Sequence, residues 1–510
     1  MWTLIGLLLG TVHVAFAAVY LYLTWFHGYW TKRGLVTAKP LTLLGSYPGL
    51  FGGGSSFIED IGKIYNKYKG KQRAVGTFLT RKPQILVLDP QLAHEVLVTK
   101  FSDYRDTVTS SYVTHSKDDY DKYVARNPFF SAGDEWKKRR TDGGAGLTPN
   151  RLKQAYAIWE QTGEMLVNYM QRCIEERHSN IIETRDLCYR YTAQAMGDFI
   201  WGIDAGSLSG SPNETSSFQR FSMNWVSHAF LSMPRFNRTP IAPIVRKLFR
   251  MRFFTQESND FYLKLTRDAA KLRQSGCGGE RSDYLAHLMQ LQEKGASLDD
   301  LVGHALTVLM DGFETSAAVL YHMLYTLGAC PEQQEKLRSE ILNALAADKH
   351  ISYEQLNALP YLDQCINESM RMTSVIGFFI KICTRPTTID LGNDKILKVE
   401  PGITVAIPSY QLHHDETYFP QPDEFRPERF DNGAASEFTK RGCLLAFGDG
   451  PRICLGMRVG LLNVKMALLR ILSEFKVEQT KKLSLSSDSG LGMYLNGDVD
   501  LRYTRIKLSK

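Results

Sequence analysis

The sequence has little of what marks several common classes of protein. Its 510 residues contain eight cysteines, none of them spaced Cys-x-x-Cys, and the net charge of +7 is spread along the chain. A disulfide scaffold or a zinc ribbon needs paired cysteines, and a nucleic-acid surface needs extended basic runs. We therefore expect no nucleic-acid partner and mostly reduced core cysteines. Internal repeats and low-complexity segments are also missing.

The N-terminus lacks charge, since no Asp, Glu, Lys or Arg precedes Lys32. The apolar stretch 4–26 would form a helix of about 34 Å, enough to cross a bilayer. Lys32 and Arg33 predict that its far end is cytoplasmic. A cleaved signal peptide is the alternative, because Ala15-Phe16-Ala17 resembles a cleavage site. The length of the run and the uncharged start favour a retained anchor.

The rest of the chain predicts a mainly α-helical protein with a small β-rich part. Apolar runs at 73–79 and 84–89 indicate strands, 90–375 is mostly helical in pattern, and short strands return at 376–410 and after 477. The sheet would combine both ends of the chain. We expect three parts: an anchor at 1–31, a hinge rich in glycine and proline at 32–55, and a single catalytic domain at 56–510.

One cysteine stands in an unusual setting, the stretch FGDGPRICLG at 447–456. Cys454 precedes a predicted helix, whose free N–H groups would stabilise a thiolate. The glycines would let the backbone pass close to a flat ligand, Arg452 would reach an anionic group on it, and Phe447 would cover it. These features suit a haem-thiolate site.

Phe447-x-x-Gly450-x-Arg452-x-Cys454-x-Gly456 resembles the haem-binding loop of the cytochrome P-450 monooxygenases. The resemblance implies the fold of that family and a haem b whose iron is bound by the Cys454 thiolate. Gly450 and Gly456 would contact the haem with Phe447 and Arg452.

Other stretches carry the same resemblance. Glu368 and Arg371 match the family's ExxR pair, and Arg429 in FRPERF matches the arginine that joins it; this network would be structural. Glu335 and Arg338 have the same spacing, but we expect a solvated helical pair there. In the family, residues matching Trp136 and Arg140 contact a haem propionate, and Lys381 takes the place of an arginine that does so.

A long apolar helix is predicted after a cap formed by Ser297 and Asp300. It contains Asp311-Gly312-Phe-Glu314-Thr315, which resembles the family's oxygen-binding groove. Gly312 predicts a local bulge or a close approach. The resemblance assigns oxygen activation to Thr315 and proton delivery to Glu314, and the alternative for Thr315 is a hydrogen bond to its own helix.

The sequence also departs from the family. Asp311 replaces a small residue and would be protonated, paired with a residue such as His304, or turned towards water. We expect it to narrow the pocket and to alter proton delivery. Gly143, Gly144 and Gly146 should end the helix after Arg140 early. Ser374 follows the ExxR pair, and Ala446 precedes the haem loop, where relatives often have proline.

The resemblance is strongest to insect microsomal enzymes that act on hormones and foreign compounds. It implies an endoplasmic reticulum protein, with its catalytic domain on the cytoplasmic face, that inserts one atom of O2 into apolar substrates. Electrons would come from NADPH through a membrane-bound reductase, with cytochrome b5 as a further partner. Two alternatives stay open: a haem-thiolate isomerase or dehydratase acting on peroxides, and a catalytically impaired relative that binds haem and lipid.

Overall fold

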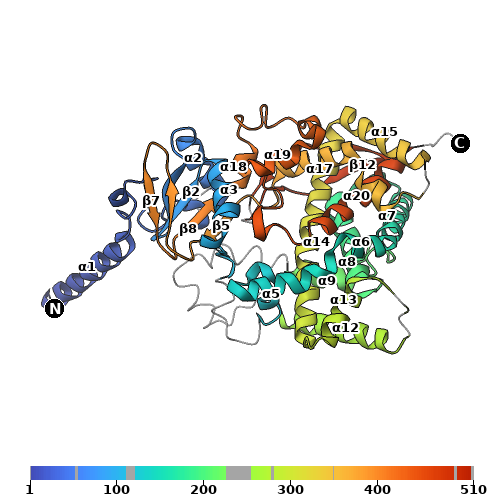
Figure 1. Cartoon of the computed structure of the whole chain (residues 1–510), viewed down its shortest axis with the longest axis horizontal. Coiled ribbons are helices and arrows are strands. Elements are labelled where there is room, and N and C mark those ends of the chain that lie inside the picture. The colour runs from blue at the N-terminus through green and yellow to red at the C-terminus, as the bar shows by residue number, and fades with distance from the viewer. Residues whose placement is uncertain are drawn as a thin grey trace.

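The computed structural model describes residues 2–51, 55–110, 121–225, 254–276, 279, 281–347, 350–487 and 491–506. Helices form most of the body, and short strands gather mainly at the end next to the N-terminal helix (Figure 1). The fold class predicted from the sequence, mainly α with a small β-rich part, is confirmed.

Helices follow one another along most of the described chain. They are α1 (Trp2–Thr24), α2 (Phe57–Tyr68), α3 (Pro90–His94), α5 (Gly133–Gly144), α6 (Pro149–Gln154), α7 (Tyr156–Arg177), α8 (Thr184–Trp201), α9 (Ser217–Trp225), α12 (Gln256–Gln274), α13 (Tyr284–Glu293), α14 (Leu298–Ala329), α15 (Pro331–Ala347), α16 (Tyr353–Asn357), α17 (Pro360–Thr373), α18 (Ser409–His413), α19 (Ala434–Lys440) and α20 (Met457–Glu474). Short helical turns include η7 (Pro128–Phe130), η8 (Ala145–Leu147), η10 (Pro427–Gly433) and η11 (Gly450–Arg452).

The strands form one larger sheet and three smaller ones. They are β1 (Ala74–Leu79), β2 (Lys82–Val87), β3 (Asp106–Thr107), β4 (Ile181–Glu183), β5 (Phe379–Ile382), β6 (Thr387–Asp390), β7 (Ile396–Val399), β8 (Thr404–Ile407), β9 (Phe475–Gln479), β10 (Leu485–Ser486), β11 (Tyr494–Leu495) and β12 (Asp500–Arg505). The five-stranded sheet has the order β1-β2-β8-β5-β3, with β2 parallel to β8 and the other pairs antiparallel. It joins early and late segments of the chain, as predicted.

Helix α14 is the central element of the helical body. Ser297 and Asp300 cap it reciprocally: the Asp300 N–H donates to the Ser297 hydroxyl at 3.2 Å, and the Ser297 N–H donates to the Asp300 carboxylate at 3.0 Å. This confirms the predicted cap. Most side chains on every face of α14 are buried against α8, α13, α17 and α20. The helix therefore holds residues 311–315 inside the protein.

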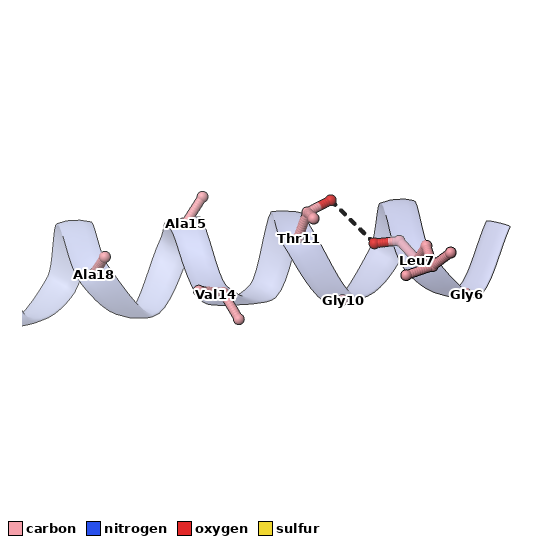
Figure 2. A pocket seen from close by; sticks show the side chains of 7 residues that line it. All are labelled: Gly6, Leu7, Gly10, Thr11, Val14, Ala15 and Ala18. Atoms are coloured by element: carbon pink, nitrogen blue, oxygen red, sulfur yellow. Dashed lines mark hydrogen bonds between the residues drawn. The ribbon is translucent and has the colours of Figure 1, made fainter. Parts of the chain in front are cut away.

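Helix α1 carries the apolar stretch and projects away from the body (Figure 1). Residues Ile5–Thr24 are long and apolar enough to cross a membrane. Three polar side chains of this segment are hydrogen-bonded to backbone carbonyls four residues earlier: Thr11 to Leu7 at 3.0 Å (Figure 2), His13 to Leu9 at 2.7 Å and Thr24 to Tyr20 at 2.8 Å. Hydrogen bonds of this kind satisfy polar groups that have no access to water.

The start of the predicted hinge is attached to the sheet. Trp30 is buried and its indole N–H donates to the Thr77 carbonyl at 3.0 Å. A Cβ at Gly76 would lie 2.5 Å from the Trp30 ring, so only glycine allows this contact. The Ala38 N–H donates to the Gly76 carbonyl at 2.9 Å. The chain leaving the anchor therefore adds to the edge of β1.

Candidate active site

The Cys454 loop is held in place by its own backbone and by the segment around Leu97. The Cys454 N–H donates to the Phe447 carbonyl at 2.9 Å. Gly448 and Gly450 have φ of 74° and 67°, a conformation that L side chains rarely adopt. A Cβ at Gly450 would lie 2.1 Å from the Leu97 carbonyl oxygen. Glycine is thus required at position 450 because the neighbouring backbone leaves no space for a side chain, whether or not a ligand binds nearby.

Cys454 faces an internal space. Its side chain has exposed surface, yet loss of hydration raises the pKa of its thiol to about 11, with a further increase from Asp311. Bulk water would not produce that loss, so the exposed surface lies within the protein. A hydrogen bond from the Gly456 N–H and the nearby Arg140 charge act in the opposite direction, favouring the thiolate. An ionised sulfur here needs a further positive charge, such as a metal ion.

The residues of α14 opposite Cys454 line the same space. Asp311 also has exposed surface in the middle of a buried helix, and loss of hydration raises the pKa of its carboxyl to about 7. The Thr315 hydroxyl donates to the Asp311 carbonyl at 2.5 Å. Thr315 therefore makes the hydrogen bond to its own helix that the sequence left open as the alternative to a role in oxygen activation. Thr315 itself is half-buried.

The partner of Asp311 is Asn127, which precedes η7. The Asn127 side-chain amide donates to the two carboxylate oxygens at 3.3 and 3.5 Å. His304 is not the partner: it packs beside Gly143, its Nδ1 lacks a hydrogen bond, and burial lowers its pKa to about 4. Of the three alternatives for Asp311, a pair with His304 is wrong because that histidine turns towards α5.

Gly312 marks a close approach and no bulge, since α14 is regular through it. A Cβ there would lie 3.1 Å from the Met196 sulfur of α8. Glu314, to which the resemblance assigns proton delivery, is also buried on the side of α14 that packs against α8. Its carboxyl is hydrogen-bonded to the Tyr189 hydroxyl, its Oε2 has no partner, and burial raises its pKa to about 7. Glu314 is therefore partly protonated near neutral pH.

Basic side chains gather beside Cys454 with too few acids to balance them. Burial lowers the pKa of Arg140 (α5), brings that of Lys381 (β5) to about 7 and that of Arg452 (η11) to about 10. The charge of Arg452 adds to the effect on Lys381. Asp106 reaches Arg452 at 3.4 Å. Within the described residues, Arg140 makes no hydrogen bond or ion pair.

Arg452 is fixed by its surroundings. Its guanidinium lies over the Trp136 ring at 4.5 Å and donates to the carbonyls of Arg105 at 2.7 Å and Ser131 at 3.0 Å. Lys381 donates to the same Arg105 carbonyl at 3.2 Å. Trp136 thus supports Arg452, and the positive charges of Lys381 and Arg452 are held side by side.

The glycines after Arg140 lie where α5 ends. The α-helix ends at Gly144, within the stretch where the glycines predict an end, and the chain continues as the short turn η8 from Ala145 to Leu147. Their small size also serves packing: a Cβ at Gly143 would lie 3.3 Å from His304, and one at Gly146 would lie 2.5 Å from His287. Close contacts with α13 and α14 are therefore a second reason for glycine at these positions.

The ExxR network is present, with Glu368 and Arg371 fully buried and Arg429 partly buried. Glu368 accepts from Arg371 at 2.7 and 3.0 Å and from Arg429 at 3.0 Å. Arg371 also donates to the carbonyls of His413 at 2.8 Å and Pro422 at 2.6 Å. Arg338, expected in a solvated pair, is instead buried and donates to the Leu472 and Phe475 carbonyls, with Glu335 exposed at its other side.

Ser374, one of the departures from the family, connects this network to the cysteine loop. The Leu445 N–H donates to His413 Nε2 at 2.8 Å, so His413 Nδ1 carries the proton and donates to the Ser374 hydroxyl at 2.8 Å. Burial keeps the pKa of His413 well below its usual value, so the ring is neutral. Sequence reasoning missed His413 and Asn127, because their partners lie 32 and 184 residues away.

The donor set fits iron protoporphyrin. Among the described residues, no group of three or more His, Cys, Asp or Glu could hold a metal ion, so Cys454 would be a single protein ligand to a metal that brings its others. Arg140, Lys381 and Arg452 supply positive charge for two carboxylates. Asp311 of α14 has exposed surface and acts electrostatically on the sulfur, so the two face one internal space. A flat ring with a central metal and two propionates meets each of these conditions.

Comparison with known proteins agrees with this site. A family model described as cytochrome P-450 matches residues 38–496. "Probable cytochrome P-450 309a1" of Drosophila melanogaster is 63% identical over 99% of this chain and 100% of its own length. "Probable cytochrome P-450 309a2" and "Probable cytochrome P-450 28d1" of the same organism are 51% and 35% identical, covering 99% and 91% of the chain and 94% and 91% of their own lengths. The chain belongs to the cytochrome P-450 family.

Proposed function

We propose that this haem monooxygenase is anchored in a membrane and inserts one atom of O2 into apolar substrates with electrons from NADPH. A reductase passes the electrons to the haem, and the second oxygen atom leaves as water. One observation carries the proposal: the Cys454 thiol and the side chains of Asp311 and Thr315 on α14 line one internal space beside unbalanced cations. When bound, the haem supplies the oxygen activation.

The loop and the cations hold the cofactor. Cys454 binds the iron, with the Gly456 N–H stabilising its negative charge. Arg140, Lys381 and Arg452 would bind the propionates, because anionic partners compensate these buried cations for the hydration that they have lost. Trp136 holds Arg452 in place. Phe447 fixes the loop through its carbonyl and would cover the cofactor, and Gly312 would act indirectly, by letting α14 pack closely against Met196 of α8.

Glu314, Thr315 and Asp311 handle protons. The pKa of Glu314 is about 7, so this carboxyl can both release and take up a proton at neutral pH, and it is hydrogen-bonded to Tyr189. The Thr315 hydroxyl is oriented by its hydrogen bond to the Asp311 carbonyl and can still accept a second hydrogen bond. The Asp311 carboxyl, one turn away, faces the same space. These groups therefore deliver and orient protons at the point where oxygen reacts.

The proposed membrane location and the proposed electron-transfer partners rest on the N-terminal segment and on exposed lysines of α5. Residues 1–31 would anchor the chain in the endoplasmic reticulum, with 56–510 on the cytoplasmic face and 32–55 between them. On α5, Lys137 and Lys138 are exposed and available to an acidic reductase or cytochrome b5. Arg139 is occupied, because it pairs with Glu135 at 2.6 Å and Asp300 at 2.8 Å.

The haem-thiolate bond is tested with carbon monoxide. Reduced wild-type protein should show the red-shifted absorption of a thiolate ligand, and Cys454→Ser should lose it, because a serine hydroxyl stays protonated and binds iron weakly. Cys330→Ser, which removes a half-buried free thiol elsewhere, is the matched control and should keep the band. An unchanged band in Cys454→Ser would disprove this ligand assignment.

Turnover separates the alternatives. With purified reductase, a monooxygenase consumes NADPH in a substrate-dependent manner; a peroxide isomerase turns over without NADPH, and a binding protein does neither. Asp311→Ala should change the ratio of product formed to NADPH consumed, since it removes a proton-carrying group next to Thr315. The ratio is measured by following both in one reaction. Identical ratios in wild type and variant would exclude Asp311 from proton delivery.

A further inference from the structure

The carboxyl of Asp311 is the acidic group that faces the internal space beside Cys454 from α14. Neighbouring side chains of this helix, Val308 and Met310, are buried and apolar, and Gly312 has none. The side chain of Asp311 has exposed surface although the backbone around it is enclosed. An acidic side chain in this setting is open to a ligand that enters the space.

The charges around Asp311 leave it without a counter-ion. From η7, Asn127 supplies a neutral amide at 3.3 and 3.5 Å, which is long for a hydrogen bond to a carboxylate. From the loop before α20, the facing group is the Cys454 thiol. On α14 itself, His304 lies two turns away against Gly143. Within the described residues, no Lys, Arg or His pairs with Asp311.

We propose that Asp311 binds the cationic nitrogen of an apolar amine, so that hydrophobic amines are a preferred substrate class of this enzyme. The inference rests on the proposed function and specifies the chemical class of its substrate. A carboxylate that has lost its hydration without a counter-ion is unstable, and a cation brings the missing charge. The apolar remainder of the ligand would occupy the rest of the space.

The pH dependence of binding follows from the same contact. The pKa of the Asp311 carboxyl is about 7 because of burial, so the empty site is largely protonated below that pH. A ligand of fixed positive charge binds the ionised form. Its affinity should therefore rise as pH increases through about 7 and level off above it. Lys381 titrates in the same range, so a neutral ligand of equal shape is needed as a reference.

The test compares two ligands that differ only in charge: trimethyl(2-phenylethyl)ammonium and its carbon isostere, 3,3-dimethylbutylbenzene. The quaternary nitrogen neither titrates nor binds iron. Dissociation constants are measured by calorimetry on the full-length, haem-loaded protein in detergent. Wild type should bind the cation at least tenfold more tightly, relative to the isostere, than Asp311→Asn does, and Asp311→Glu should keep the preference.

A matched control uses the second buried carboxyl of the same helix. Glu314 faces Tyr189 and α8, so Glu314→Gln should leave the cation preference unchanged. The carbon monoxide band shows that each variant retains the haem-thiolate site. An equal cation-to-isostere ratio in wild type and Asp311→Asn, with normal bands in both, would overturn this inference alone. A missing band in wild type would overturn the proposed function together with it.

Discussion

The charge of Lys381 should destabilise the haem-free fold and stabilise bound haem. It is buried in β5 beside Arg452, and burial lowers the pKa of its ammonium group to about 7. An ordinary lysine has a pKa near ~10.4 in the unfolded chain. The folded, haem-free protein therefore binds this proton less tightly than the unfolded chain does. The cost to folding is present at and below pH 7 and disappears as pH rises towards ~10.4.

Lys381→Met should therefore have opposite effects on the two forms. In haem-free protein at pH 7 it should stabilise the fold by a few kcal/mol at most, on the order of the lost pKa shift, with no gain near pH 10. In haem-loaded protein it should speed the loss of haem, because a propionate loses its partner. Denaturant titrations at both pH values and haem transfer to a scavenger protein measure the two effects. Slower haem loss would exclude a propionate contact.

At this scale, sequence predicted the residues that act through local geometry. Cys454 before a helix, the ExxR pair and the cap of α14 all depend on neighbours a few positions away. Asn127 could be predicted as a cap, because its side chain accepts from the Phe129 N–H at 2.8 Å. Its contact with Asp311 could not, since nothing local to either residue encodes a pairing between segments so distant in the chain.

At the scale of elements, contacts between helices determine which glycines can be replaced. The glycines after Arg140 predict a helix end by propensity, and α5 ends at Gly144. Gly146 lies where Tyr284 and His287 of α13 leave no room for a methyl group. Propensity along the chain could therefore predict the end of α5, but not the packing of Gly146 against α13, which depends on the folded arrangement.

Gly146→Ala and Gly460→Ala should differ in sign. The new Cβ at Gly146 would lie 2.5 Å from His287, and this overpacking should cost about 1–3 kcal/mol of unfolding free energy. At Gly460, inside α20, the nearest atom is the Ser316 hydroxyl at 3.5 Å, an ordinary contact. Alanine there should stabilise by up to about 1 kcal/mol. Denaturant unfolding of the haem-loaded protein measures both, and equal effects would contradict the packing argument.

Across the whole molecule, two sets of contacts connect segments that are distant in the chain. The segment after the anchor packs Trp30 into β1, and β1 shares its sheet with β8 and β5 from the second half. On the other side, the buried network links Glu368 of α17 through Arg371 and His413 to Leu445, just before the cysteine loop. The sequence predicted the first sheet and the network's members; the His413 link depends on the finished fold.

The ExxR network should contribute far more to the free energy of unfolding than an exposed ion pair with a similar N–O distance. Arg429 is 8% exposed at its side chain and bonds Glu368 at 3.0 Å, so Arg429→Ala leaves a buried carboxylate with one cation and should cost about 3–5 kcal/mol. Lys476 and Glu478 are 3.2 Å apart with side chains 50% and 44% exposed, and Lys476→Ala should cost less than about 1 kcal/mol. Because the network is connected through His413 to Leu445, just before the cysteine loop, Arg429→Ala should also weaken the carbon monoxide band as haem is lost. Denaturant unfolding tests the loss of stability, and the carbon monoxide spectrum of the same samples tests the loss of haem. Equal losses of stability in the two variants would mean that the buried carboxylate is not held by Arg429.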